Sequence, residues 1–185
     1  MSVSAGERLA SPGARPFKPE HFAFPAGSVN ACFRPIADAT VAGDNPFMSK
    51  LALRYRLDDA DDFGWLDVAV TTDRFSGRGG FWVQWQDVRE FGEKLSTYPI
   101  QPNAPLVAAW GYDKQEGDDL VVSIKIASAN ATGDLQVRVE LADYEEKFER
   151  IRTSFLTNYA DLEEFRIAIA SLMSRNADEA VLSGR

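Results

Sequence analysis

The feature that most constrains the fold of this chain is an alternation of apolar and polar residues in several short segments. Apolar side chains occupy every second position in residues 51–57, 66–72, 120–126 and 135–141. Successive side chains of a strand point to opposite faces, so a period of two predicts strands with one buried face. A helix of 3.6 residues per turn does not place alternate residues on one side. These segments therefore predict an antiparallel β-sheet.

Three further segments complete a set of about seven predicted strands. Residues 81–85 and 106–110 are short apolar runs, and residues 148–156 form a less regular one. The glycine-rich segment Arg74–Gly80 before the third strand predicts a hairpin turn. Its Gly77-Arg78-Gly79-Gly80 run lacks the Gly-Lys-Ser/Thr ending of a phosphate-binding loop, so a turn is the preferred interpretation.

Two segments have the helical period instead. Asp87 and Glu90 have the spacing of a capping box, and the apolar residues that follow predict a short helix ending before the prolines at 99–105. A second helix is predicted to begin with Thr157 or Asn158 as its N-cap. The apolar stripe of this helix should pack on the sheet. The stripe consists of Tyr159, Leu162, Phe165, Ile169 and Leu172.

The predicted order βββ-α-ββββ-α defines an α+β fold, with an antiparallel sheet of about seven strands and two amphipathic helices. Short links between the strands favour hairpins. We expect one domain over residues 48–175 and a frayed tail over residues 176–185. Residues 1–47 hold six of the nine prolines and show no regular period, which predicts an irregular segment. Because the first clean strand follows Met48 at once, we expect the native start at Met48.

The net charge of −8 disfavours nucleic-acid binding, which normally depends on clustered Lys and Arg. It favours a basic protein partner instead. No run approaches the ~18 apolar residues of a membrane span. Residues 1–16 lack the apolar core of a signal peptide. A cytoplasmic protein without nucleic-acid or membrane partners is therefore predicted.

Residues 48–185 contain no histidine and no cysteine, the side chains on which many catalytic and transition-metal sites depend. His21 is the only histidine and Cys32 the only cysteine, and both precede that region. A Ser-His-Asp relay and the usual transition-metal ligands are thus excluded there. The Asp58–Asp62 run lacks the glycine and distant glutamate of an EF-hand and predicts a solvated turn. We expect no cofactor and no enzyme; a hydrolase using two facing carboxylates is the remaining catalytic alternative.

Two acidic loops are the main candidate for a binding surface. If the fourth to seventh strands form a continuous meander, loops 112–119 and 143–147 emerge at the same end of the sheet. Lys114 and Lys147 only partly offset their carboxylates. The candidate partner-binding residues are Asp113, Asp118, Asp119, Asp143 and Glu146.

Four segments also carry a resemblance to a known family. They are the Gly-Phe-Trp-Val strand at 80–83, the acidic helix start at 87–95, the Gly-Asp-Leu-Gln-Val segment at 133–137 and Phe-Leu-Thr-Asn-Tyr at 155–159. In this order they resemble the WapI-type immunity proteins of bacterial contact-dependent competition. Asn158 departs from that pattern, which more often has an acidic residue there. The resemblance spans residues 64–173 and implies an inhibitor that binds a cognate toxin.

These observations predict a non-enzymatic protein-binding domain, an immunity protein whose acidic loops bind a basic, nuclease-like toxin. The alternative is a carbohydrate- or small-ligand-binding sheet. Trp82 is the candidate residue for that function, because its neighbours Phe81 and Val83 occupy the opposite face of their strand.

Overall fold

The computed structural model describes residues 48–58, 61–113, 116–143, 145–146 and 149–185. The predictions for residues 1–47 lie outside the described residues.

The first sheet consists of four antiparallel strands in the order β3-β2-β1-β8. They are β1 (Ser49–Leu57), β2 (Phe63–Thr71), β3 (Ser76–Gln84) and β8 (Ala180–Gly184). Leu51 of β1 lies opposite Val70 of β2 on one side and Leu182 of β8 on the other. The first and the last described strands of the chain are therefore neighbours.

The second sheet is an antiparallel meander in the order β4-β5-β6-β7. Its strands are β4 (Leu106–Gly111), β5 (Leu120–Ser128), β6 (Asp134–Ala142) and β7 (Arg150–Asn158). A short 3₁₀ turn, Gly117–Asp119, leads into β5. The continuous meander, on which the expected shared end of the two acidic loops depends, is therefore present.

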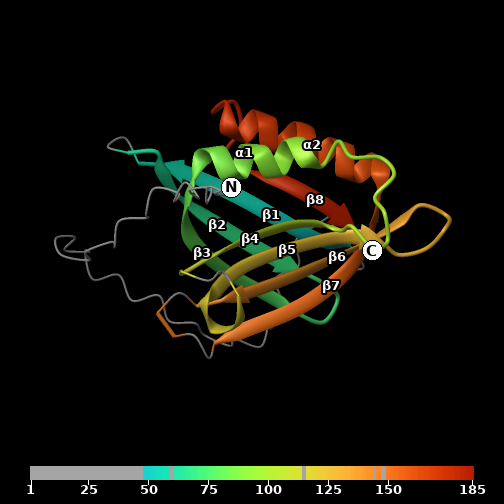
Figure 1. Cartoon of the computed structure of the whole chain (residues 1–185), viewed down its shortest axis with the longest axis horizontal. Helices are drawn as coiled ribbons and strands as arrows, with labels where there is room; N and C mark the ends of the chain where they lie inside the picture. The colour runs from blue at the N-terminus through green and yellow to red at the C-terminus, as the bar shows by residue number, and fades with distance from the viewer. Residues whose placement is uncertain (1–47, 59–60, 114–115, 144, 147–148) are drawn as a thin grey trace, which may run out of the picture. The chain divides into compact units, whose positions relative to one another are not determined.

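Two helices lie side by side on the same side of the strands (Figure 1). They are α1 (Trp85–Lys94), which joins the two sheets, and α2 (Tyr159–Met173), which joins β7 to β8. A Cβ atom at Gly92 of α1 would lie 2.7 Å from Cγ2 of Ile169 of α2. A glycine is therefore required where the helices approach most closely.

The core lies between the sheets and beneath the helices, and it draws on every sheet strand and both helices. The sheets also meet at one corner, where the backbone N–H and C=O of Leu156 pair with those of Arg185 at 3.1 and 2.8 Å. On β3, a Cβ atom at Gly79 would lie 3.5 Å from Cβ of Leu141 on β6. The two sheets are therefore in direct contact at this point of β3 and β6.

The predicted α+β fold class, with antiparallel pairing and two helices, is confirmed. Among the described residues there are eight strands in two sheets, whereas the sequence predicted about seven in one sheet. The extra strand is β8, so the prediction of a frayed tail over residues 176–185 is wrong for its last part. Ala180 and Leu182 are fully buried against β1. No helix in the described part of the chain is long and apolar enough to cross a membrane.

The glycine-rich segment also differs from its prediction. Residues 76–80 belong to β3, and Gly79 pairs with Val68 of β2. The turn lies earlier, where the Thr72 N–H donates to the Phe75 carbonyl at 2.7 Å. A Cβ atom at Gly77 would lie 2.7 Å from Cγ2 of Ile151 on β7. Small residues here therefore allow close packing of the sheets rather than a turn.

The helix starts were predicted with mixed success. The side chain of Asn158 caps α2 by accepting hydrogen bonds from the N–H groups of Ala160 and Asp161 at 2.8 and 3.0 Å, as predicted. The capping box at Asp87 is wrong, because α1 begins two residues earlier with Gln84 as an N-cap that makes no side-chain hydrogen bond. Asp87 instead lies in the first turn of the helix, where a carboxylate interacts favourably with the positive end of the helix dipole.

Candidate functional site

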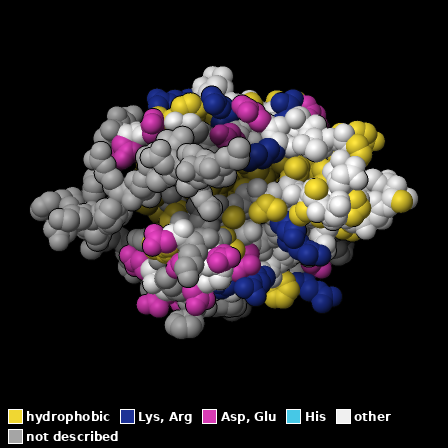
Figure 2. Space-filling view, in the orientation of Figure 1, with side chains coloured by type: hydrophobic (Ala, Val, Ile, Leu, Met, Phe, Trp, Pro, Cys, Tyr) yellow, Lys and Arg dark blue, Asp and Glu magenta, His cyan; other side chains and the backbone are white. Residues whose placement is uncertain are grey.

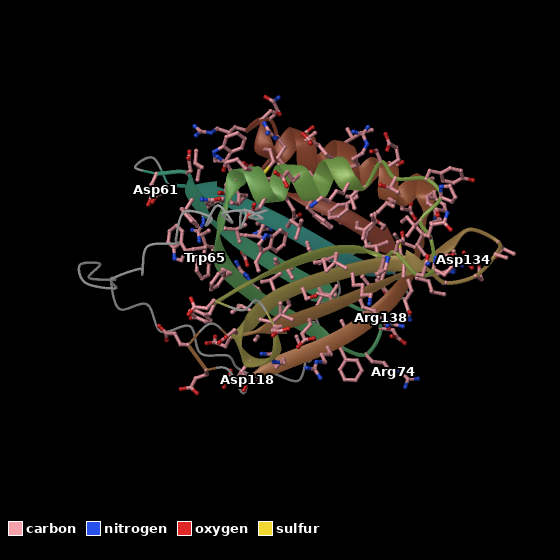
Figure 3. The ribbon with its side chains drawn as sticks, viewed as in Figure 1. Asp61, Trp65, Arg74, Asp118, Asp134 and Arg138 are labelled. Atoms are coloured by element: carbon pink, nitrogen blue, oxygen red, sulfur yellow. The ribbon has the colours of Figure 1, made fainter. Side chains whose placement is uncertain are left out.

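The loops β4–β5 and β6–β7 emerge at the same end of the second sheet, because alternate connections of an antiparallel meander share an end. Figure 3 shows Asp118 at this end and Asp134, which begins β6, at the other end. The five predicted partner-binding residues thus belong to one region of the surface. We call this region the acidic end; its carboxylates are Asp113, Glu116, Asp118, Asp119, Asp143, Glu145, Glu146 and Glu149.

Most of these side chains are exposed. Asp113, Asp118, Asp143 and Glu146 are exposed, and Asp119 is half-buried. Glu149 is a further exposed carboxylate that the sequence analysis missed, because it assigned residues 148–156 to a strand that in fact begins at Arg150. Its place beside the β6–β7 connection could be found only once the start of β7 was known.

Backbone hydrogen bonds hold the first loop in shape. The Tyr112 N–H donates to the Asp119 carbonyl at 2.7 Å, and the Asp119 N–H donates to the Glu116 carbonyl at 3.1 Å. A Cβ atom at Gly111 would lie 2.0 Å from the Asp119 carbonyl oxygen, so only glycine permits the loop to fold back this closely. The ring of Tyr112 packs edge-on against Phe81 of β3, with centroids 5.3 Å apart.

The second loop is organised around Asp143. Its Oδ1 accepts hydrogen bonds from the N–H groups of Glu145 and Glu146, both at 2.8 Å. The Asp143 N–H donates to the Glu149 carbonyl at 2.8 Å, and the Glu149 N–H donates to the Glu146 carbonyl at 2.9 Å. These hydrogen bonds join the four described acidic residues of the second loop to one another.

The acidic end accounts for most of the excess negative charge of the protein. Loops 112–119 and 143–149 hold eight carboxylates and two lysines, a formal net charge of −6 out of −8. Figure 2 shows acidic side chains gathered at the lower left, the region where Figure 3 places Asp118. Among the described residues, no three carboxylates lie close enough together to hold a metal ion.

The outer face of the second sheet carries the opposite charge. Glu140 lies there between Arg150 and Arg152, and Arg152 Nη2 donates to Glu140 Oε1 at 3.0 Å. Burial opposes ionisation of this carboxyl, but the hydrogen bonds from the two arginines outweigh it and lower the Glu140 pKa. The negative charge of the acidic end therefore does not continue along the sheet.

Trp82, the candidate residue of the alternative function, lies on the outer face of the first sheet. Its side chain is 42% exposed. It pairs across the strands with Trp65, and their rings make an edge-to-face contact with centroids 5.6 Å apart. Trp65 in turn lies opposite Arg56 of β1. The alternation of residues along this strand thus correctly predicted that Trp82 points away from the core.

No protein-family model matches this chain, and a search of curated proteins finds no match either. The resemblance to WapI-type immunity proteins therefore stays a prediction.

Proposed function

We propose that this protein is a binding domain whose acidic end engages a basic protein. In its most specific form, it is an immunity protein that neutralises a cognate nuclease-like toxin in the cytoplasm. The observation that supports this proposal is the concentration of eight carboxylates on two adjacent loops.

The physical reason is electrostatic steering. A surface rich in one sign of charge raises the association rate of an oppositely charged partner by roughly 10- to 1,000-fold at low ionic strength. Nuclease toxins act on polyanions and need basic surfaces, so an acidic surface complements them.

The proposal predicts a loss of binding when charges at the acidic end are reversed. We expect the protein to restore growth of cells that express the toxin encoded beside it. The double variant Asp118→Lys/Glu146→Lys should associate with that toxin roughly tenfold or more slowly than the native protein, because both loops lose attraction. Both side chains are exposed, and the Asp143 carboxylate that orders the second loop is left in place. Growth rescue and the association rate, measured at two salt concentrations, are the readouts.

The matched control is the double variant Glu90→Lys/Glu164→Lys, which makes the same change of charge at exposed positions on α1 and α2. It should leave rescue and association rate near native values, and circular dichroism should show that all variants are folded. Failure of the native protein to rescue growth from any neighbouring toxin would contradict the immunity function. Equal effects of the double variant and the control would contradict the role of the acidic end.

A second candidate function is carbohydrate or small-ligand binding on the outer face of the first sheet. The exposed indole of Trp82 favours it, since sugar rings stack on exposed aromatic side chains. This function predicts that a glycan shifts the tryptophan fluorescence and that Trp82→Ala abolishes the heat of binding. Phe75→Ala, at an exposed aromatic residue in the β2–β3 turn, is the control. A glycan panel without any shift would eliminate this candidate.

A further inference from the structure

A groove of about 710 Å³ lies at the part of β1 that β8 leaves uncovered. The pairing of β8 with β1 ends at Ala180, opposite Leu53, so residues 54–57 of β1 extend beyond β8. The turn that follows α2 forms another wall of the groove, with Arg175, Ala177 and Asp178. The volume is in the range of small-molecule sites in proteins.

Arginine is the dominant polar residue of this groove. Four arginines line it, with Asp67 and Asp178 as the two carboxylates; the arginines are Arg54, Arg56, Arg78 and Arg175. Over the lining residues alone the formal charge is +2, from four arginines and two aspartates. Glu179, which pairs with Arg54, and Asp61, Asp62 and Asp87 near Tyr55 lie around the groove.

Two of these arginines already have partners. Arg78 Nε donates to Asp67 Oδ1 at 2.8 Å, and Arg54 Nε donates to Glu179 Oε1 at 2.9 Å. Arg56 and Arg175 make no ion pair with any residue of the described part. Their guanidinium groups are available to a ligand.

Arg175 also has an unusual backbone. Its φ is +60°, in the left-handed region that favours glycine. The Asn176 N–H donates to the Ser171 carbonyl at 2.9 Å, which completes the helix-terminating motif that normally has glycine at the position of Arg175. Strained backbone of this kind gathers at functional sites. A binding role of its side chain in the groove would explain why arginine, rather than glycine, occupies this position.

The remaining walls are largely apolar. They include Leu172, Met173 and Trp85. Tyr55 also lines the groove, and its hydroxyl donates to the Val83 carbonyl at 2.8 Å. Burial, with a smaller contribution from nearby aspartates, raises the pKa of Tyr55 to about 12, so this side chain stays neutral.

We propose that this groove binds a small organic anion with two negative charges, a dicarboxylate or a phosphate monoester. Arg56 and Arg175 pair with its charged groups, because the guanidinium fork matches the geometry of carboxylate and phosphate oxygens. Leu172 and Met173 contact its apolar part. This site shares no residue with the acidic end and does not depend on the proposed protein partner.

The test is calorimetric titration of the full chain with phthalate and with phenyl phosphate, and benzyl alcohol serves as the uncharged probe. We expect saturable binding of at least one anion at a single site and none of the alcohol. Which anion binds more tightly distinguishes carboxylate from phosphate recognition. Amide chemical shifts that change around residues 172–178 would locate the site.

Two variants and one control make the test specific. Arg175→Gly removes the guanidinium and relieves the backbone, so it should unfold at higher temperature than the native protein yet bind roughly tenfold or more weakly. Arg56→Ala should weaken binding similarly. Arg138→Ala, which removes an exposed arginine from the second sheet, should leave affinity unchanged. No saturable binding of either anion, or equal weakening by Arg138→Ala, would overturn the proposal.

Discussion

Replacing Phe165 with alanine is expected to lower the free energy of unfolding by about 3–5 kcal/mol. Phe165 is the largest side chain of the core that is fully buried, and it lies on the face of α2 that packs into the protein. The truncation removes apolar contact and leaves a cavity that the surrounding strands can fill only in part. Urea denaturation followed by circular dichroism measures the loss.

The control is Ile167→Ala, two residues further along the same helix. Ile167 is 52% exposed, so its truncation should change the free energy of unfolding by no more than about 0.5 kcal/mol. Similar losses in the two variants would mean that α2 does not bury the face described above.

Leu182→Ala is expected to destabilise the protein by about 2–5 kcal/mol. Leu182 is fully buried in β8 opposite Leu51, and the strand also continues into the Leu156–Arg185 pairing that joins the two sheets. A loosened β8 should therefore weaken the corner between the sheets as well as the core. Urea denaturation gives the free energy, and hydrogen exchange of the Leu156 amide reports on the corner.

Val181→Ala is the matched control, because Val181 is the neighbouring residue of β8 but is 37% exposed. Its cost should be near the roughly 0.5 kcal/mol typical of surface positions. If Leu182→Ala cost no more than Val181→Ala, the end of the chain would behave as the frayed tail that the sequence predicted, and β8 would not contribute to stability.

The acidic end and the arginine groove can be tested separately, because they share no residues. The acidic end would attract a basic macromolecule by the field of many carboxylates. The groove would hold a small anion between two guanidinium groups and apolar side chains. Charge reversal at Asp118 and Glu146 should therefore leave anion binding intact, and Arg175→Gly should leave toxin rescue intact.

The sequence alone was sufficient to predict elements that depend on local pattern. Alternation located strands such as 120–126 and 135–141, and the amide side chain of Asn158 indicated the start of α2. The strand order of a meander follows from short connections, so the shared location of Asp118 and Asp143 could be predicted as well. Each of these inferences uses residues that are close in the chain.

Only the tertiary structure decided the features that depend on distant residues. Ala180 and Leu182 form too short an alternating pattern to predict a strand. The strand β8 forms because its backbone pairs with the edge of β1 and its apolar side chains are buried in the core. The glycines of β3 suggest a turn until Ile151 of β7 is seen to leave no room for a side chain at Gly77. Likewise, Arg56 and Arg175 meet at one groove only through folding. Local pattern fixes which face of a strand is apolar, whereas the choice of partner depends on packing between segments far apart in the sequence.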